Sequence, residues 1–216
     1  MIRAVMFDLD GTLVHSAPGV LASFRETFAT EGVAAITAID EKVIGPPLMT
    51  TLTRLTGIVD SARLDQLART FKATYDTDGV LLADPYPGMI DVFRQIVDGG
   101  GQAFVVTNKR LGSARIIAER LGMMPFLAGV YALDSYSPPA ATKRIVLANL
   151  LTEHRIVPQS ALMVGDSVED ADAAAANGVR FAAAIYGYGS PLTFAAAAPT
   201  VVLQRLADLP AALAGL

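Results

Sequence analysis

Short apolar runs and helical patterns alternate along most of the chain. Residues 2–7 are largely apolar, contain two β-branched side chains and lack in-and-out alternation, which predicts a strand buried on both faces. Four more strands are predicted, at residues 102–106, 126–133, 161–164 and 179–185. Helical patterns lie between them, at residues 87–97, 111–121, from about 143, and 170–176. Repeated strand–helix units of this size predict an α/β fold, a doubly wound parallel sheet with helices on both faces.

The block after the first strand has a different pattern. Apolar residues at helical spacing predict helices at residues 18–31, 37–44, 48–55 and from about 60, and no strand is predicted there. Thr37 is the expected N-cap of the second helix. The sequence therefore predicts two domains, a core of residues 1–14 and 84–216 and a small all-helical insertion of residues 15–83.

Composition and charge narrow the class of protein. No run of the 216 residues approaches the ~20 apolar positions of a membrane helix. The formal net charge of −4, without a basic cluster, argues against nucleic acid or an anionic membrane as a partner. The absence of cysteine excludes disulfides and thiolate metal sites. With no signal-peptide pattern at the N-terminus, we expect a cytoplasmic protein; the sequence gives no indication of oligomeric state.

Polar side chains follow the predicted strands at the points where the strands end. Asp8 and Asp10 follow the first strand, Thr107 the second and Asp166 the fourth, while Lys143 lies in the third crossover. Ligands bind outside the carboxyl ends of the strands in such sheets, so these residues are expected to converge. Taken singly, each has a simpler interpretation as a strand-end threonine, a solvated lysine or a helix-start carboxylate.

The spacing of Asp8 and Asp10 carries the chemistry. On an extended backbone, every second side chain points to the same side, so the carboxylates of Asp8 and Asp10 lie on one side. They repel there unless a cation or a proton lies between them. A solvated Asp-x-Asp-Gly turn at the end of a strand is the alternative.

Four motifs in order resemble the haloacid dehalogenase superfamily over the whole chain. They are Asp8-x-Asp10-Gly11-Thr12, Val106-Thr107-Asn108-Lys109, Lys143, and Gly165-Asp166-Ser167-x-x-Asp170. The helical insertion looks like that family's cap domain. Residues 44–48, 107–109 and 186–190 are similar to the phosphoglycolate phosphatase and 5′-nucleotidase-like branch. His15 stands where relatives carry an aspartate, which puts the local charge of the cap hinge in question.

The resemblance implies a phosphatase that uses Mg²⁺ and an aspartyl-phosphate intermediate. Asp8 would be the nucleophile and would bind the metal with Asp166 and the backbone carbonyl of Asp10, while the Asp10 side chain would be the general acid and base. Lys143 would balance the charge of Asp8 and phosphate, and Asp170 would orient Lys143 or a metal-bound water. Thr107 and Asn108, the turn at Gly11 and Thr12, and Gly45 of the cap are the expected substrate contacts.

Three other functions need weighing. A dehalogenase shares the nucleophile, but its relatives lack an acid at the position of Asp10. A mutase of the β-phosphoglucomutase type keeps all four motifs and differs in its cap, so it stays open. A catalytically silent binding module on the same fold is the third, and an intact set of charged residues argues against it because unneutralised buried carboxylates cost stability.

The expected partner is a small phosphate ester. Its identity is not indicated by the sequence, and Arg25, Lys42 and Arg54 are further candidates for selecting it.

Overall fold

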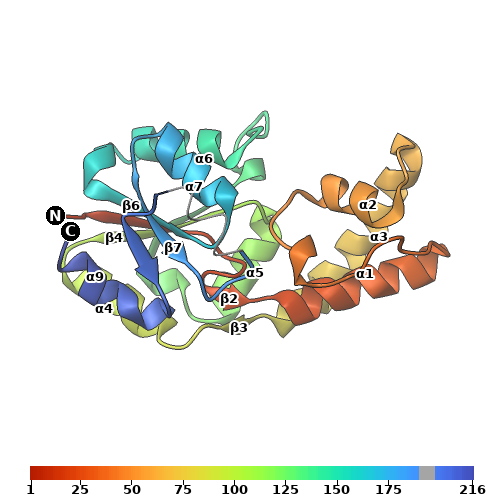
Figure 1. The fold of residues 1–216 in the computed structure, drawn as a ribbon, viewed down its shortest axis with the longest axis horizontal. Helices are drawn as coiled ribbons and strands as arrows, with labels where there is room; N and C mark the ends of the chain where they lie inside the picture. Colours follow the sequence, from red (N-terminus) through yellow and green to blue (C-terminus); the bar gives the residue numbers. More distant parts are fainter. Residues whose placement is uncertain (190–197) are drawn as a thin grey trace. The chain divides into compact units, whose positions relative to one another are not determined.

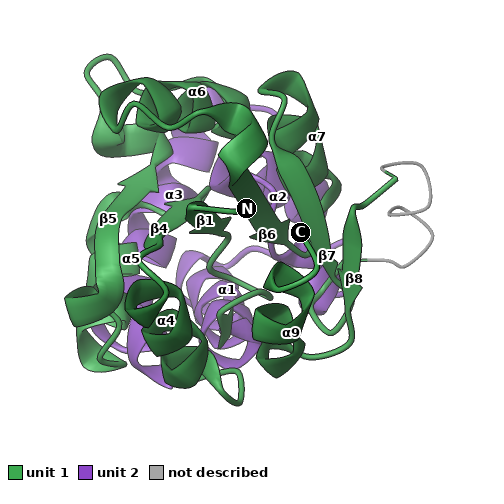
Figure 2. Cartoon of the chain, turned by 90° about the vertical axis from the view of Figure 1, so that its left-hand side faces the viewer, with its two compact units in different colours: residues 1–15, 85–216 green, residues 16–84 purple. Residues whose placement is uncertain are grey.

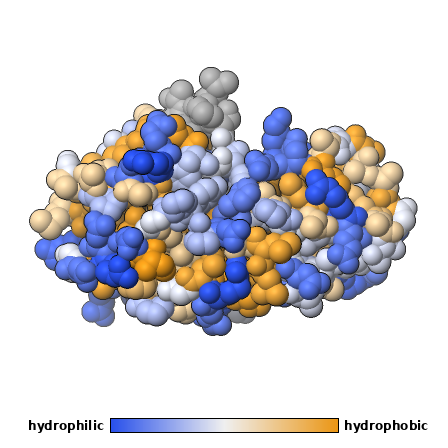
Figure 3. All heavy atoms as spheres, turned by 90° about the horizontal axis from the view of Figure 1, so that it is seen from below, coloured by the Kyte–Doolittle hydropathy of each residue, from blue (hydrophilic) through white to orange (hydrophobic). Residues whose placement is uncertain are grey.

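The computed structural model describes residues 1–189 and 198–216, which form two compact units. Unit 1 contains residues 1–15 and 85–216, and unit 2 contains residues 16–84 (Figure 2). Within the described residues, no helix combines the length and the apolarity needed to cross a membrane. On the face seen in Figure 3, hydrophobic residues occur in groups broken up by hydrophilic ones.

A parallel sheet organises unit 1 (Figure 1), and its strand order β5-β4-β1-β6-β7-β8 can be followed in Figure 2. Its strands are β1 (Ala4–Phe7), β4 (Gln102–Thr107), β5 (Leu127–Ala132), β6 (Ala161–Gly165), β7 (Arg180–Ala184) and β8 (Val201–Leu203). The predicted doubly wound parallel sheet is therefore confirmed. The sequence pattern did not predict β8, a three-residue strand near the end of the chain.

Helices cover both faces of this sheet. They are α4 (Met89–Asp98), α5 (Leu111–Arg120), α6 (Lys143–Glu153), α7 (Val168–Ala176) and α9 (Leu209–Leu213). Short 3₁₀ turns join them: η3 (Met124–Phe126), η4 (Leu133–Ser135), η5 (Pro158–Ser160) and η6 (Leu206–Asp208). Figure 2 shows α6 and α7 on one side of the sheet and α4 and α9 on the other.

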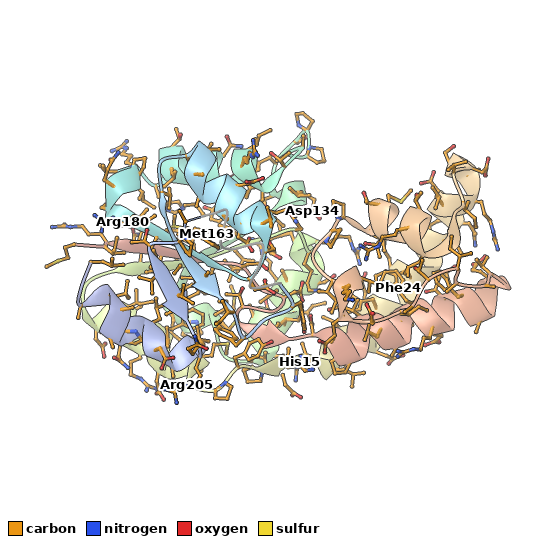
Figure 4. The ribbon with its side chains drawn as sticks, in the orientation of Figure 1. His15, Phe24, Asp134, Met163, Arg180 and Arg205 are labelled. Atoms are coloured by element: carbon orange, nitrogen blue, oxygen red, sulfur yellow. The ribbon has the colours of Figure 1, made fainter. Side chains whose placement is uncertain are left out.

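The apolar residues of the central strand β1 pack on both faces of the sheet. All four of its residues are buried, because side chains with period two serve opposite faces of the sheet. Met6 belongs to the cluster that includes Met163 (labelled in Figure 4) and the buried side of α6 and α7. Phe7 faces the other way and packs edge-on against Phe93 of α4, with ring centroids 5.4 Å apart.

Unit 2 is built on α1 (Ala17–Glu31), α2 (Leu48–Thr56) and α3 (Ser61–Thr77), with the 3₁₀ turns η1 (Glu41–Val43) and η2 (Gly79–Leu82). Phe24 points from α1 into the interior of the unit (Figure 4), and its ring centroid lies 4.4 Å from that of Phe71 on α3. The carboxylate of Glu31 accepts hydrogen bonds from Arg63, Gln66 and Thr70, which fastens the end of α1 to α3.

Two secondary-structure predictions for this region are wrong. The helix predicted at residues 37–44 is only the turn η1, and its cap is Asp40, whose side chain accepts the N–H of Lys42 at 3.1 Å, instead of Thr37. Asp40 has an extended backbone, with φ −123° and ψ −177°, so a helix cannot run through it, and only the three residues of η1 that follow it are helical. His15 also belongs to a strand: β2 (Val14–His15) pairs with β3 (Asp84–Pro85), and two-residue strands carry no periodic signal.

Gly19 and Gly112 provide a matched pair of substitutions. A Cβ added to Gly19 of α1 would lie 1.9 Å from the backbone oxygen of Gly79, whereas one added to exposed Gly112 of α5 meets nothing within 4 Å outside its own helix. We expect Gly19→Ala to lower the free energy of unfolding by about 1–3 kcal/mol through overpacking. Gly112→Ala should raise it, by up to about 1 kcal/mol, because alanine favours a helix. Urea denaturation measures both values, and equal values would contradict the close approach of α1 to η2.

Candidate active site

The candidate site lies at the carboxyl ends of the three central strands. β1 lies between β4 and β6, and Phe7, the last residue of β1, is in register with Val105 and Val164 of these neighbours. From β1 the chain passes to β4 and β5 on one side, then returns to build β6, β7 and β8 on the other. The strand order therefore switches direction at β1, which is where open α/β sheets bind ligands.

Lys143 joins two carboxylates at this edge. It is the first residue of α6, and its side chain is only 4% exposed. Its Nζ donates to Oδ1 of Asp8 at 2.8 Å and to Oδ1 of Asp170 at 2.6 Å. The predicted cluster of Asp8, Lys143 and Asp170 is thus brought together in space from three separate elements.

Asp170 is fixed by the start of α7. Its Oδ2 accepts hydrogen bonds from the backbone N–H of Ser167 at 3.0 Å and from the Ser167 hydroxyl at 2.6 Å. The Ser167 Oγ in turn accepts the N–H of Asp170, which completes a capping box. Both oxygens of Asp170 therefore already have donors, and the residue serves as an anchor for Lys143.

Asp166 is held by the turn after β1 and by the segment after β7. The backbone N–H of Tyr188 donates to its Oδ2 at 2.7 Å, and the Thr12 hydroxyl donates to its Oδ1 at 3.4 Å. A Cβ on Gly11, where φ is +83°, would lie 2.1 Å from Oδ2 of Asp166, and one on Gly187 would lie 2.5 Å from the same atom. Both positions therefore require glycine for Asp166 to keep its place.

Burial and charge shift the ionisation of the cluster. Burial raises the pKa of Asp8 well above its usual value, an effect opposed by Lys143 and reinforced by Asp170 and Asp166. Burial, followed by the charge of Asp170, raises the pKa of Asp166 to about 7. Burial alone would lower the pKa of Lys143, but its two carboxylate partners outweigh that effect and raise it, so the ammonium stays charged.

The cluster fits a hard divalent cation. Asp8, Asp166 and Asp170 each offer a carboxylate oxygen, and these oxygens lie within 4.8 Å of one another. Asp170 is bound by the charged Lys143 and twice by Ser167, whereas Asp166 accepts, within the described residues, only neutral donors, one of them at 3.4 Å, and Asp8 is bound by Lys143 at one oxygen. Asp8 and Asp166 are therefore the residues better suited to hold the ion. Four aspartates meet two lysines at this edge once Asp10 and Lys109 are included, so a divalent cation would neutralise the excess negative charge.

Asp10 has a different partner from Asp8. Its Oδ2 lies 3.0 Å from Nζ of Lys109, and its Oδ1 is buried without a hydrogen bond from any described residue. The sequence pattern placed the two carboxylates on one side, with a cation or a proton between them, whereas in the structure each carboxylate is paired with a lysine of its own. Lys109 was noted only as part of a motif, and nothing in its spacing identified it as the partner of Asp10.

The turn after β4 carries the next predicted residues. Buried Thr107 accepts the N–H of Lys109 at 3.1 Å through its own Oγ1, and the Asn108 amide donates to the carboxylate of Glu169 on α7. Thr107 and Asn108 therefore lie on a turn that is tied both to itself and to α7.

Gly45 lies in unit 2, between η1 and α2, with a φ of +106° and no atom within 4 Å of an added Cβ. Nearby, Arg25 and Arg54 donate to the backbone oxygens of Ile39 and Lys42, at 3.1 and 2.7 Å. These two arginines hold the segment before Gly45. Their proposed contact with substrate stays a prediction.

Two tyrosines of the segment that holds Asp166 make contacts that the sequence did not predict. The Tyr186 hydroxyl donates to the backbone oxygen of Thr12 at 2.9 Å, and the Tyr188 hydroxyl lies 3.1 Å from Nδ1 of His15 (labelled in Figure 4). In the stretch 186–190, whose sequence is similar to the phosphoglycolate phosphatase branch, the described part supports Asp166, and Ser190 lies outside the described residues.

Comparisons with known proteins agree with this geometry. Phosphoglycolate phosphatase from Rhodospirillum rubrum is 35% identical over 204 residues, covering 87% of this chain and 81% of the relative. The enzyme of the same name from Cereibacter sphaeroides is 35% identical over 192 residues, covering 85% of each chain. A haloacid dehalogenase-like family hydrolase from Streptococcus pneumoniae superposes with a TM-score of 0.87 and 26% identity over 98% of both chains. The sequence profile named haloacid dehalogenase-like hydrolase matches residues 5–184. The chain belongs to the haloacid dehalogenase-like hydrolase family.

Proposed function

We propose that this protein is a Mg²⁺-dependent phosphatase that hydrolyses a small phosphorylated metabolite through an aspartyl-phosphate on Asp8. One observation carries the proposal: Lys143 binds Asp8 and Asp170 at the switch point of the sheet, where a third buried carboxylate, Asp166, completes the cluster. The phosphoglycolate phosphatases described above make 2-phosphoglycolate the first substrate to test.

Phosphate monoesters need large accelerations, up to ~10²¹-fold, and positioning with charge neutralisation supplies most of them. The Asp8 carboxylate attacks phosphorus, and the leaving oxygen departs as the new oxygen–phosphorus bond forms. Lys143 holds Oδ1 of Asp8 at 2.8 Å, which orients the nucleophile and offsets part of the negative charge of the phosphoryl group.

The metal would be held by the carboxylates of Asp8 and Asp166 and, as the family resemblance implies, by the backbone carbonyl of Asp10. Bound there, Mg²⁺ would neutralise charge on the transferring phosphoryl oxygens. Asp166 reaches this position because Thr12, Tyr188 and the two glycines around it fix its carboxylate. Thr12 therefore contributes through Asp166 as well as through the predicted phosphoryl contact at Gly11 and Thr12.

Asp10 would protonate the leaving oxygen and then take a proton from the water that hydrolyses the aspartyl-phosphate. Thr107 and Asn108, on the turn after β4, would bind the phosphoryl oxygens. Residues 15–83 would act as a cap that excludes water during transfer, and the turn at Gly45 would contact the rest of the substrate.

Metal removal and a substrate panel test the proposal most broadly. We expect hydrolysis of 2-phosphoglycolate or another small phosphate ester with Mg²⁺, and loss of turnover in excess chelator. Ca²⁺ should substitute poorly, because it relaxes the octahedral geometry that Mg²⁺ imposes. Release of inorganic phosphate is the measurement. Full activity in chelator would contradict the roles of Asp8 and Asp166 as ligands.

The raised pKa of Asp166 makes the metal-free protein sensitive to pH. Its folded pKa is about 7 against an ordinary value of 3.8, so the protonated form stabilises the fold. That stability is fully present below about pH 4 and is lost as the pH rises through about 7, with a limiting slope of about 1.4 kcal/mol per pH unit. Because Mg²⁺ competes with the proton, the stability gained from Mg²⁺ should grow over the same range.

Urea denaturation with chelator or with Mg²⁺, from about pH 5 to about pH 8, measures this linkage. Asp166→Asn is the control, since it cannot ionise at this position and should remove the part of the decline that Asp166 contributes, with most of the Mg²⁺ effect, while the part from Asp8 remains. A gain from Mg²⁺ that is independent of pH in the native protein would contradict the assignment.

The two aspartates after β1 can be separated by trapping the phosphoprotein. Asp8→Asn removes the nucleophile and should give no covalent intermediate. Asp10→Asn keeps the nucleophile but loses the base for the second step, which should slow turnover by at least ~10²-fold. With an aryl phosphate, whose leaving group needs little protonation, phosphoprotein should accumulate in Asp10→Asn and be visible by intact mass measurement after rapid quench. Phosphoprotein in Asp8→Asn would require the two roles to be redrawn.

A further inference from the structure

The ion pair between Lys109 and Asp10 has no part in the roles assigned so far. Lys109 lies on the turn after β4 and Asp10 on the turn after the adjacent strand β1, and their charged atoms are 3.0 Å apart. The two side chains are only 8% and 12% exposed. The pair therefore joins two neighbouring turns of the candidate site from within.

The burial of this pair sets it apart from the surface pairs of the chain. Arg94 and Asp91 on α4, for example, have side chains 54% and 70% exposed. Exposed pairs of that kind contribute little, about 0–1 kcal/mol. Taking two charges out of water costs desolvation energy that the mutual attraction repays only with good geometry, so stability alone is a weak explanation for a buried pair. What the Lys109 pair does supply is a fixed orientation for the carboxylate of Asp10.

The two oxygens of Asp10 differ in a way that shows what this orientation achieves. Oδ2 is bound by Lys109, while Oδ1 is buried with no hydrogen bond from any described residue. A buried acceptor left unsatisfied costs free energy, so an Oδ1 kept in that state is poised for a partner that arrives from outside the chain. Because Lys109 already binds Oδ2, Oδ1 is the oxygen that is left for proton exchange with an incoming substrate or water.

We propose that Lys109 is a positioning residue, which holds Oδ2 of Asp10 so that Oδ1 exchanges the proton with the substrate. The inference rests on the proposed function, in which Asp10 is the acid and base. In the first step the Oδ1 proton passes to the leaving oxygen as its bond to phosphorus breaks and the bond from Asp8 forms. In the second, Oδ1 takes a proton from water as the water oxygen attacks phosphorus and the bond to Asp8 breaks.

The turn that carries Lys109 supports this role. The backbone N–H of Lys109 donates to Thr107 Oγ1 at 3.1 Å, so the predicted phosphoryl contact and the positioning lysine belong to one hydrogen-bonded turn. The Asn108 amide, bound to Glu169, ties the same turn to α7. One rigid turn would thus set both the phosphoryl group and the proton donor, which is the preorganisation that general acid catalysis requires.

The dependence of rate on the leaving group tests the proposal. Lys109→Met removes the ammonium and keeps a long apolar side chain. We expect kcat/KM, which reports the steps up to formation of the aspartyl-phosphate, to fall about 10- to 100-fold for an alkyl phosphate, whose leaving group needs a proton. The loss of kcat/KM for 4-nitrophenyl phosphate should stay below about threefold, because that leaving group departs unprotonated. The Mg²⁺ concentration for half-maximal activity should change little, because the ion pair of Lys109 is with the Asp10 side chain, whereas the carboxylates of Asp8 and Asp166 are the proposed metal ligands.

Two variants and a control complete the design. The ratio of the two rates within one sample is independent of the folded fraction, so poor folding of Lys109→Met does not obscure the result. Lys109→Arg, which keeps a charged donor, should restore the native ratio in large part. Arg94→Met, which removes an exposed basic residue, should leave the ratio unchanged. Equal losses on both esters in Lys109→Met, or no recovery in Lys109→Arg, would overturn the inference.

A double-mutant cycle separates this inference from the proposed function. If Lys109 acts through Asp10, Lys109→Met should cost little more in the Asp10→Asn background, with a factor below about three. If the two losses are instead additive, while Asp10→Asn alone still slows the alkyl ester more than the aryl ester, then Lys109 does not act through Asp10. That result would overturn the role of Lys109 and leave Asp10 as the acid. If Asp10→Asn loses kcat/KM equally on both esters, the assignment of Asp10 as the acid fails, and the inference fails with it.

Discussion

The charge of Lys143, buried between Asp8 and Asp170, is the interaction on which the rest of the site depends. An unpaired ammonium at this depth would be strongly disfavoured, and so would either carboxylate without it. Each partner comes from a different element: Asp8 from the end of β1, Lys143 from the start of α6 and Asp170 from the first turn of α7. The two ion pairs of Lys143 therefore form only when β1, α6 and α7 are in place together. The capping box between Ser167 and Asp170 fixes the position of the Asp170 carboxylate.

Close backbone packing around Asp166 completes this arrangement. Gly11 and Gly187 approach its carboxylate too closely for any side chain, and Thr12 and Tyr188 supply its donors. The same two segments hold aromatic contacts: Tyr186 binds the backbone of Thr12, and its ring lies 4.9 Å from that of Tyr86. Two kinds of contact therefore hold the charged groups of the site in place. Ion pairs position Asp170, and close backbone packing at two glycines positions Asp166. In the resulting site carboxylates outnumber lysines, and this excess of negative charge favours a divalent cation.

Much of this could be predicted from the sequence because it depends on local pattern. The apolar run before Asp8 predicts β1, strand–helix alternation predicts the parallel sheet, and carboxyl-end placement predicts that Asp8, Lys143 and Asp166 converge. The pairing of Lys109 with Asp10 was not predictable, because lysine reaches several carboxylates and only packing selects one. The helix expected at residues 37–44 is also wrong, because its apolar spacing does not show that Asp40 adopts an extended backbone and caps the short turn that follows.

The central claim is that Asp8 is the phosphoryl acceptor beside a metal held with Asp166. A crystal structure with Mg²⁺ and beryllium trifluoride, a mimic of a phosphoryl group, tests it most directly. The account predicts the fluoride adduct on the Asp8 carboxylate, a metal ion bound by Asp8 and Asp166, and Lys143 still in contact with both Asp8 and Asp170. Density for the adduct on another residue, or a metal bound away from Asp166, would contradict it.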